Sequence, residues 1–298
     1  MLDLTRLRVL VALARTGSVT AAARELHYSQ PSVSHHLARL EAETGAKLVQ
    51  RAGRGVRLTD AGRQLAARAA EILGRLEAAE TELAAHVGLR QGRVRLAAFP
   101  SALGTFVPAA AARLAAEHPG LELRLAEAEP PEAIRMLRAG HIDVAVIFRY
   151  DDSVPEDDGI GMRRLLEDPT YVVAAEPPSA ELAAYAGGAW IAGCDRCRMH
   201  LLRLCARAGF EPTIGFTTDD FVAVQAMVAA GLGVATLPGL ALRAARHPGV
   251  RVAPLPDSPR YVMAATYGAP PHQPATAALL TALAEAAAVS PTAAPAPA

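Results

Sequence analysis

The apolar and polar positions near the N-terminus predict three short helices, with a tight turn between the second and the third. An apolar face repeats at helical spacing before Gly17, and the next segment, VTAAARELH, follows Ser18 as its N-cap. The third helix is predicted after Ser29, another preferred N-cap residue, and Gly45 is its stop signal. Its buried stripe would consist of Val33, Leu37 and Leu40. This arrangement is typical of a helix-turn-helix.

A hairpin and a long helix are predicted next. The stretch LVQRAGRGVRLTDAG has strand-like flanks around Gly53-Arg54-Gly55, which indicates a β-wing. Thr59 can cap a helix that begins near Asp60. In that helix apolar residues recur at spacings of four and three: Leu65, Ala69, Ile72, Leu76, Ala79 and Leu83. This spacing predicts a dimerisation seam of about three heptads, and the alternative is that the helix packs on its own domain.

From Arg93 onward, strands alternate with helices. The strand candidates are RVRLAAF, LELRLAEA, IDVAVIF, YVVAAE, AWIAG, LGVATLP, VRVAPL and YVMAATY. The helix candidates are SALGTFVPAAAARLAAEH, PEAIRMLRAG, MHLLRLCARAGF, DDFVAVQAMVAAG and ATAALLTALAEAAA. This order predicts an α/β domain with a mostly parallel sheet, and the final SPTAAPAPA is typical of a disordered tail.

The distribution of charge adds a functional clue. The 298 residues have a net charge of +0, yet residues 1–95 hold 15 Lys+Arg against 9 Asp+Glu, and residues 96–298 hold 15 against 21. A basic N-terminal part indicates a nucleic-acid-binding end, and chance is the alternative. Three cysteines make no disulfide framework, and the sequence has neither a signal peptide nor an apolar run of about 18 residues. The prediction is a soluble cytoplasmic protein.

Three segments resemble one known family. TGSVTAAARELHYSQPSVSHHLARLEAETGAKLVQRAGRGVRLTDAG resembles the DNA-binding segment of LysR-type transcriptional regulators. AGHIDVAVIF and VQAMVAAGLGVATLPG are similar to recurring segments of that family's effector domain, so the resemblance covers about residues 2–285. It implies an all-α winged helix-turn-helix domain (1–58), a linker helix for dimerisation (59–88) and a two-lobed α/β effector domain similar to periplasmic binding proteins (93–288), followed by the tail (289–298).

The resemblance also implies partners. These are double-stranded promoter DNA, a small-molecule effector bound between the lobes, and further copies of the chain in a dimer or tetramer; RNA polymerase is left open as another. The sequence contains no G-x-S-x-G, Walker A or H-E-x-x-H motif, so neither an enzyme nor a cofactor is predicted. A solute-binding module would explain the α/β part and leave the helix-turn-helix unexplained.

The outward face of the third helix is the predicted base-reading surface, because its side chains are the ones free to enter the major groove. The family commonly has Arg where His35 stands, and a neutral imidazole cannot reproduce the Arg fork on a guanine. Arginines of the wing are expected to hold phosphates, and solvated surface groups are the alternative. The predicted DNA-binding residues are Ser29, Gln30, Pro31, Ser34, His35, Arg39, Arg51 and Arg54.

Effector-binding candidates follow the carboxyl ends of predicted strands, where α/β proteins bind their ligands. The helix after RVRLAAF could hold an anion at its free N–H groups. For Ser101 and Thr218 the alternative role is helix capping. The candidates are Pro100, Ser101, Ala102, Phe148, Arg149, Thr217 and Thr218.

The segment GCDRCRMHLLRLC leaves several functions open. Cys197 stands at a predicted helix start beside Arg196, which favours a reactive thiol, so a redox switch of Cys194, Cys197 and Cys205 is one alternative. Zinc binding with His200 is another, although no second metal-binding pair follows. The resemblance places this loop at the cleft between the lobes, which makes Cys194 and Arg196 effector-binding candidates as well.

Overall fold

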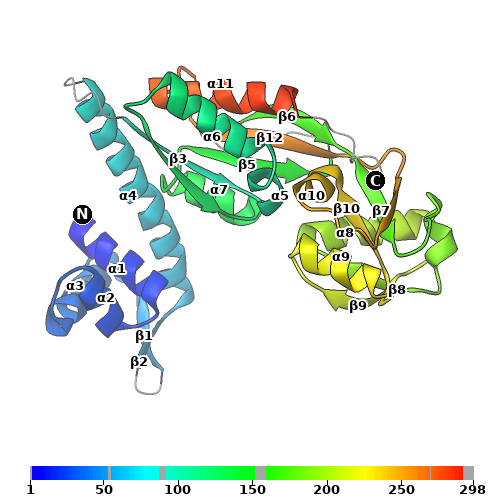
Figure 1. The fold of residues 1–298 in the computed structure, drawn as a ribbon. Helices are drawn as coiled ribbons and strands as arrows, with labels where there is room; N and C mark the ends of the chain where they lie inside the picture. The colour runs from blue at the N-terminus through cyan, green and yellow to red at the C-terminus, as the bar shows by residue number, and fades with distance from the viewer. Residues whose placement is uncertain (1, 53–54, 87–91, 152–158, 269, 291–298) are drawn as a thin grey trace. The chain divides into compact units, whose positions relative to one another are not determined.

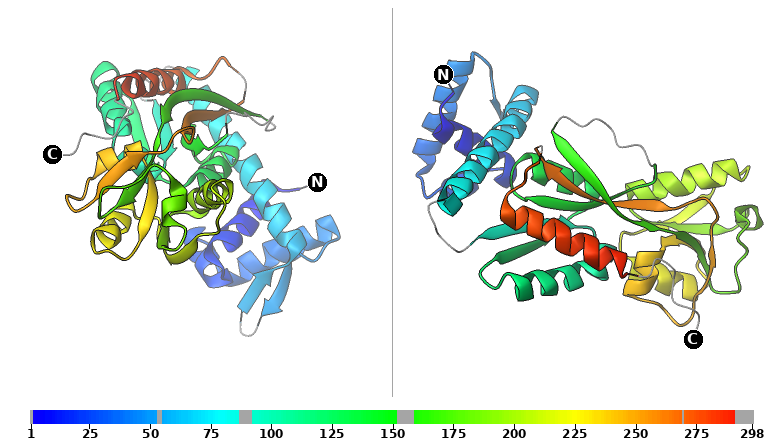
Figure 2. Two further views of the ribbon diagram at one scale, coloured as in Figure 1. Left: turned by 90° about the vertical axis from the view of Figure 1, so that its right-hand side faces the viewer. Right: turned by 90° about the horizontal axis from the view of Figure 1, so that it is seen from above.

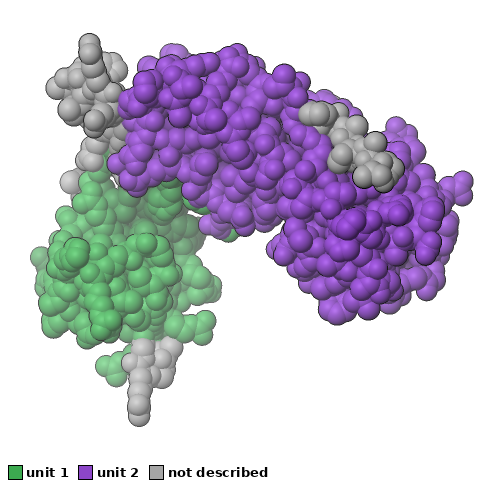
Figure 3. All heavy atoms as spheres, in the orientation of Figure 1, with its two compact units in different colours: residues 1–91, 135–143 green, residues 92–134, 144–298 purple. Residues whose placement is uncertain are grey.

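The structure is a computed structural model that describes residues 2–52, 55–86, 92–151, 159–268 and 270–290 (Figures 1 and 2). The chain divides into two compact units, which are residues 1–91 with 135–143 and residues 92–134 with 144–298 (Figure 3). Each unit has its own hydrophobic core. Among the described residues, no helix has both the length and the apolar character needed to cross a membrane.

The first unit begins with the predicted helix-turn-helix. Ser18 caps the second helix and Ser29 the third, while Gly17 and Gly45 take the left-handed backbone conformation, with φ of 71° and 66°, at the ends of the first and the third. Val33, Leu37 and Leu40 are buried in the core, as predicted. The three helices are α1 (Leu4–Thr16), α2 (Val19–Glu25) and α3 (Gln30–Thr44).

The wing and the long helix complete this unit. Strand β1 (Val49–Ala52) pairs antiparallel with β2 (Gly55–Leu58), so the winged domain is not all-α. Helix α4 (Asp60–His86) begins after Thr59, whose hydroxyl accepts a hydrogen bond from the Gly62 amide at 3.0 Å. The predicted helix boundaries hold here because each cap is encoded by residues next to it in the sequence.

The predicted seam of α4 is buried in the core at its beginning and exposed or half-buried in its middle. Leu65 packs against the core of the first unit and Ala69 is fully buried in it, which agrees with the alternative of packing on the chain's own domain. Ile72 is 46% exposed and Leu76 is half-buried, so the middle of the helix keeps an apolar surface. The side chain of Leu83 lies outside the described part of the chain.

The second unit has two lobes, each built on a five-stranded sheet. In the first lobe, helices α6 (Phe106–Glu117) and α11 (Pro274–Ala288) lie side by side over the sheet, and the short α5 (Pro100–Leu103) follows one of its strands (Figures 1 and 2). Helix α7 (Pro130–Arg138) follows another strand, and its residues from Arg135 onward are grouped with the first unit. The strand order is β4 (Glu122–Glu127), β3 (Arg93–Ala98), β5 (Val144–Arg149), β12 (Arg260–Tyr267) and β6 (Ile160–Asp168).

The sheet of the second lobe has the order β11 (Arg251–Pro254), β7 (Thr170–Ala174), β10 (Val234–Pro238), β8 (Ala189–Ala192) and β9 (Thr213–Thr217). Its helices are the 3-10 helix η1 (Leu182–Tyr185), α8 (Asp195–Arg207), α9 (Phe221–Ala229) and α10 (Gly239–Ala244). The chain crosses from the first lobe to the second between β6 and β7, and it returns between β11 and β12.

Two expectations about this unit were wrong. The sheets are mixed rather than mostly parallel, because β12 pairs antiparallel with β5 and β6, and β7 with β10 and β11. The strands that carry the chain between the lobes are among these antiparallel ones. The predicted helix SALGTFVPAAAARLAAEH is broken into α5 and α6 at Gly104, where a Cβ would lie 2.8 Å from the Cβ of Ala244.

Candidate DNA-binding surface and effector pocket

The outward face of α3 carries four of the predicted DNA-binding side chains. Pro31, Ser34, His35 and Arg39 are exposed, opposite the buried stripe of the helix. Helix α3 lies at one end of the first unit, next to α2 (Figure 1). This face therefore presents the pyrrolidine ring of a proline, a hydroxyl, an imidazole and a guanidinium to solvent.

Other polar residues near the start of α3 have structural partners. The hydroxyl of Ser29 accepts a hydrogen bond from the Ser32 amide at 3.3 Å, and the amide group of Gln30 donates to the hydroxyl of Thr20 on α2. The His36 ring stacks on Tyr28 with 5.7 Å between ring centroids. His35 and His36, adjacent in sequence, thus differ: His36 packs against the turn, while His35 remains exposed.

The wing contributes arginines from both of its faces. Gln50 lies opposite Arg57 and Arg51 opposite Val56, so Arg51 and Arg57 point to opposite sides of the two-stranded ribbon. Both side chains are exposed. Arg54, predicted with Arg51 to hold phosphates, lies outside the described residues.

Glu41 attaches the wing to α3, a role that sequence reasoning missed. Its carboxylate accepts hydrogen bonds from the amides of Leu48 (2.8 Å) and Val49 (3.1 Å) and from the ammonium of Lys47 (3.0 Å). Burial opposes ionisation, but the hydrogen bonds from Val49, Lys47 and Leu48 outweigh it and lower the pKa of Glu41. The carboxylate therefore fixes where the wing begins relative to the recognition helix.

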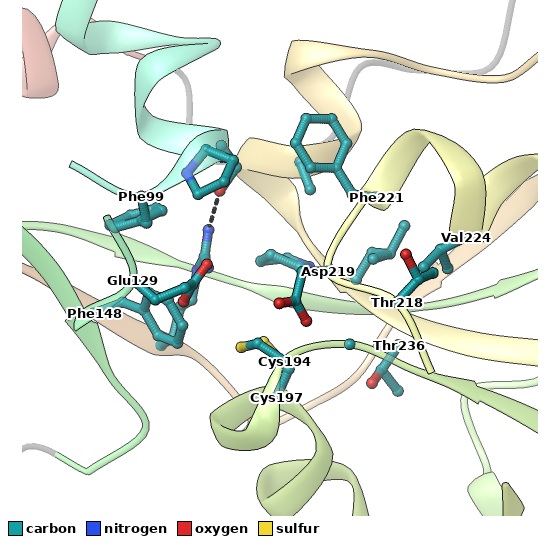
Figure 4. Close-up of a pocket in the computed structure, with 17 residues that line it drawn as sticks. Phe99, Glu129, Phe148, Cys194, Cys197, Thr218, Asp219, Phe221, Val224 and Thr236 are labelled. Carbon is teal, nitrogen blue, oxygen red and sulfur yellow. Dashed lines mark hydrogen bonds between the residues drawn. The ribbon is translucent and has the colours of Figure 1, made fainter. Parts of the chain in front are cut away.

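A pocket opens between the two lobes of the second unit (Figure 4). It holds about 500 Å³ of empty space, part of which is open solvent. Segments from both sheets line it: Phe99, Pro100, Ser101, Glu129, Phe148, Gly193, Cys194, Cys197, Thr218, Asp219, Phe221, Val224, Thr236, Leu237, Pro238, Ala241 and Arg260. A pocket at the carboxyl ends of strands agrees with the rule used for the sequence-based candidates.

Five predicted effector-binding residues line this pocket, and four do not. Those in its wall are Pro100, Ser101, Phe148, Cys194 and Thr218. Those outside it are Ala102, Arg149, Arg196 and Thr217.

Each of the four residues outside the pocket is next to, or two positions from, a candidate that lines it. Ala102 is buried in the core of the first lobe, and Arg149 pairs with Asp151 at 2.7 Å. Arg196 and Thr217 are exposed. Neighbouring positions on a strand or at a helix start point in different directions, so a segment can reach the pocket while one of its side chains does not.

A buried ion pair, absent from the sequence-based candidates, holds Arg260 in the wall of the pocket. Arg260, the first residue of β12, donates from Nε to Asp168 at 2.8 Å and from a terminal nitrogen to the hydroxyl of Ser101 at 2.8 Å. Its guanidinium lies over the rings of Phe99 (4.8 Å) and Phe148 (4.6 Å). Because Asp168 neutralises this cation, it contributes little net positive charge to the pocket.

Two carboxyl groups add negative charge. Figure 4 shows Glu129 and Asp219 directed toward one part of the pocket, close to Cys194. Burial, together with the charge of Asp219, raises the pKa of Glu129. One carboxyl oxygen of Glu129, Oε2, is buried and has no hydrogen-bond partner within the described residues. Such a group is satisfied only if a ligand, a water molecule or a proton reaches it.

The cysteines separate into a pair and a single residue. Cys194 Sγ and Cys197 Sγ lie 3.1 Å apart in the pocket wall, whereas Cys205 is buried in the core of the second lobe beside Trp190. His200 bonds with Ser258 at 2.9 Å and stacks on Tyr150. In the described part of the chain, no three His, Cys, Asp or Glu side chains gather as a metal site would require.

A winged helix-turn-helix followed by a two-lobed α/β domain with a pocket defines a DNA-binding regulator with a ligand-binding domain. Two family models match the chain: "Bacterial regulatory helix-turn-helix protein, lysR family" over residues 4–63 and "LysR substrate binding domain" over residues 88–288. The chain belongs to the LysR family of transcriptional regulators.

Individual relatives agree with this assignment. The chain is 30% identical over 269 residues to the HTH-type transcriptional regulator TfdS of Cupriavidus pinatubonensis, covering 86% of this chain and 89% of that protein. A shorter match to the HTH-type transcriptional regulator YvbU of Bacillus subtilis is 36% identical over 148 residues, covering 49% of this chain and 51% of the relative.

Solved structures share the fold. The crystal structure of CbnR, a LysR family transcriptional regulator, superposes with a TM-score of 0.67 at 22% identity, covering 96% of this chain and 99% of CbnR. Full-length CbnR in complex with its target DNA gives a TM-score of 0.65 at 22% identity, covering 96% of this chain and 100% of that one.

Proposed function

We propose that this regulator changes its DNA affinity when a small molecule occupies the pocket between the lobes. The observation that carries the proposal is the pocket itself, which combines aromatic and aliphatic walls with a few polar groups and joins both lobes. A ligand that touches both lobes can favour one arrangement of them over another, which is the requirement for control of a distant site.

For DNA recognition, we propose that Ser34, His35 and Arg39 read base edges and that Arg51 and Arg57 hold the backbone. The exposure of these side chains supports these roles, and the related fold of CbnR has been crystallised with target DNA. Ser29 and Gln30 act mainly through their intramolecular hydrogen bonds, which shape the start of α3.

Binding of single variants to cognate and scrambled duplexes tests these roles. His35→Ala should lose about 1–3 kcal/mol on the cognate duplex alone. Arg57→Ala should weaken binding to both duplexes and lower the salt slope by about one unit. If His35→Ala binds both duplexes like the wild type, His35 makes no base contact.

The lining of the pocket also indicates a class of ligand. Phe99, Phe148 and Phe221 suit an apolar body, while the carboxyl groups of Glu129 and Asp219 require hydrogen-bond donors. The predicted anion is disfavoured, because Arg260 is already paired and the hydroxyl of Ser101 is engaged with it. We therefore propose a largely apolar ligand with hydrogen-bond donors rather than an acid.

Two adjacent threonines provide a matched test of the pocket. Thr218 lines the pocket and Thr217 does not, although Thr217 is the last residue of β9 and Thr218 follows it directly. A panel of small metabolites is screened by the thermal shift of the full chain. A compound that stabilises the wild type should also stabilise Thr217→Phe but not Thr218→Phe, in which the ring fills the space. Equal stabilisation of all three proteins would place the ligand elsewhere.

The other functions that the sequence left open are less well supported. A solute-binding module alone does not account for the winged helix-turn-helix of residues 4–63. A switch that joins all three cysteines is opposed by the burial of Cys205 in a separate core, where burial raises the pKa of its thiol to about 11.

A further inference from the structure

The wall of the pocket contains two thiols held in contact by the start of one helix. Cys194 is the N-cap of α8 and Cys197 lies three residues later, so both side chains face the same side of the first turn. Their sulfur atoms are 3.1 Å apart, and the cysteines are not bonded to each other. The preceding residue, Gly193, allows this packing, because a Cβ there would lie 3.1 Å from the Cβ of Cys197.

The surroundings distinguish the two thiols chemically. Cys194 donates a hydrogen bond to Cys197, and the Tyr150 hydroxyl donates another at 3.5 Å. The hydrogen bond from Cys194 has the largest effect, and with Tyr150 and the charge of Arg260 it lowers the pKa of Cys197 to about 7 despite burial. The same contact, together with burial, raises the pKa of Cys194. Cys197 is thus the thiol that ionises more readily, and Cys194 is the one that keeps its proton.

Further groups hold this arrangement in place. The Tyr150 ring stacks on His200 with 3.7 Å between centroids and an interplanar angle of 8°, and His200 bonds with Ser258 at 2.9 Å. This fixes the direction of the Tyr150 hydroxyl toward Cys197. On the other side, the Glu129 carboxyl is directed toward the part of the pocket that Cys194 lines (Figure 4). A carboxyl group whose pKa is raised can accept the proton that Cys194 must lose before it reacts.

We propose that Cys194 and Cys197 form a reversible disulfide in the pocket wall, so that the pocket responds to a hydroperoxide as well as to its ligand. This proposal rests on the proposed function, because the disulfide acts by changing the pocket that controls DNA binding. The sulfurs need to approach by only about 1 Å to reach the bonding distance of about 2.05 Å.

The chemistry balances with a hydroperoxide as the oxidant. The Cys197 thiolate attacks one peroxide oxygen, the O–O bond breaks, and a sulfenic acid forms as hydroxide leaves. Cys194 then gives its proton to Glu129 and attacks the sulfenic sulfur; the S–S bond forms, the S–O bond breaks, and the departing hydroxide takes a proton to become water. With hydrogen peroxide, two thiols and one peroxide yield one disulfide and two waters, and two electrons pass from sulfur to oxygen.

The disulfide would change the pocket in two ways. Cys197 would lose its negative charge, and the Tyr150 hydroxyl would lose the acceptor it has in the reduced form. Cys194 would lose its thiol proton and the hydrogen bond to Cys197, which changes the surroundings of the Glu129 carboxyl close to it (Figure 4). The oxidised pocket therefore binds the same ligand with a different affinity.

The experiment treats the reduced full chain with hydrogen peroxide, blocks free thiols with iodoacetamide after unfolding, and maps the peptides by mass spectrometry. The expected result is a chain lighter by two hydrogen atoms, with Cys194 and Cys197 protected, Cys205 alkylated, and reversal by dithiothreitol. Cys205→Ala should behave like the wild type, and Cys194→Ser should stop at a sulfenic acid on Cys197 that dimedone traps.

The rate of oxidation supplies a second readout. It should rise with pH through about 7, following the Cys197 thiolate. Tyr150→Phe keeps the ring that stacks on His200 and removes the hydroxyl, so the midpoint of its rate profile should move to higher pH. An unchanged midpoint would show that the Tyr150 hydroxyl does not lower the pKa of Cys197.

Three outcomes would overturn the proposal: all three cysteines still alkylated after peroxide, a disulfide only between chains, or direct conversion of Cys197 to a sulfinic acid. None of these needs DNA or a pocket ligand, so such a failure leaves the proposed function standing. Conversely, the disulfide could form as expected while no compound changes the affinity of the chain for DNA. That result would count against the proposed function alone.

Discussion

Removal of Asp168 should expose how strongly the buried ion pair holds the effector domain together. Its side chain is 0% exposed and that of Arg260 is 3% exposed. Asp168→Ala removes the acceptor of the Arg260 Nε hydrogen bond and that of the Leu240 amide at 2.9 Å. A buried guanidinium that loses its partner costs about 3–5 kcal/mol, so Asp168→Ala should lower the free energy of unfolding by that amount.

A surface pair in the same lobe provides the control. Arg149 and Asp151 are 2.7 Å apart, but the side chain of Asp151 is 57% exposed. Asp151→Ala should cost no more than about 1 kcal/mol, because water and salt screen an exposed pair. Both costs come from urea unfolding followed by the fluorescence of Trp190, the only tryptophan, which is buried in the second lobe.

A double variant separates the loss of charge pairing from the loss of packing. Asp168→Leu with Arg260→Met removes both charges and keeps apolar contact with Phe99 and Phe148. It should be more stable than Asp168→Ala, because no unpaired charge stays buried. The reasoning is refuted if Asp168→Ala costs as little as Asp151→Ala, or if the double variant is the least stable protein.

Three further predictions concern the rest of the chain. Ile72→Asp places a charge on the exposed apolar surface of α4 and should reduce the assembly size measured by light scattering; an unchanged size would exclude this part of α4 from the interface. Glu41→Ala should destabilise the winged unit by about 1–3 kcal/mol in urea unfolding followed by circular dichroism, and in the wild type this contribution should disappear as pH falls below 4.5, since the pKa of Glu41 is lowered by folding. Burial and the nearby arginines lower the pKa of His200 to about 4, so the stability of the effector domain should fall between pH 6.5 and 4 as the unfolded chain takes up the proton; His200→Phe should flatten that part of the profile, and an equally steep profile would contradict the assignment.

The sequence predicted best what depends on neighbouring residues. Ser18, Ser29 and Thr59 cap helices as expected, because an N-cap needs only its own hydroxyl and an amide two or three positions ahead. The wing followed from the glycines at its tip and the strand-like residues beside them. These are local signals, and no distant contact was needed to interpret them.

The parts that were missed depend on distant partners. Arg260 and Asp168 are 92 positions apart, and neither position has a pattern that marks it as part of a pocket. Strand β6 was overlooked because GIGMRRLLED has charged residues where an apolar run was sought; it is a strand because β12 pairs along its whole length. Tertiary pairing decided both cases, and a single sequence does not record it.

The candidate pocket residues could be predicted only in part, because they depend on both local signals and distant contacts. The rule on strand ends identified segments that reach the pocket, and Ser101 and Thr218 are among the residues that line it. It did not distinguish Thr218 from Thr217, because that choice depends on the direction of each side chain at the end of β9. It also gave no information on Glu129, whose importance arises from burial and from the nearby Asp219.

The central claim is that the pocket between the lobes controls the DNA affinity of the winged domain. The most direct test measures the affinity of the full chain for its cognate duplex, at fixed salt, with and without a compound that stabilises the wild type and not Thr218→Phe. The account predicts a change in the dissociation constant of about fivefold or more, the usual size of coupling between two sites, and no change in Thr218→Phe. Identical affinities in the wild type with and without the bound compound would contradict it.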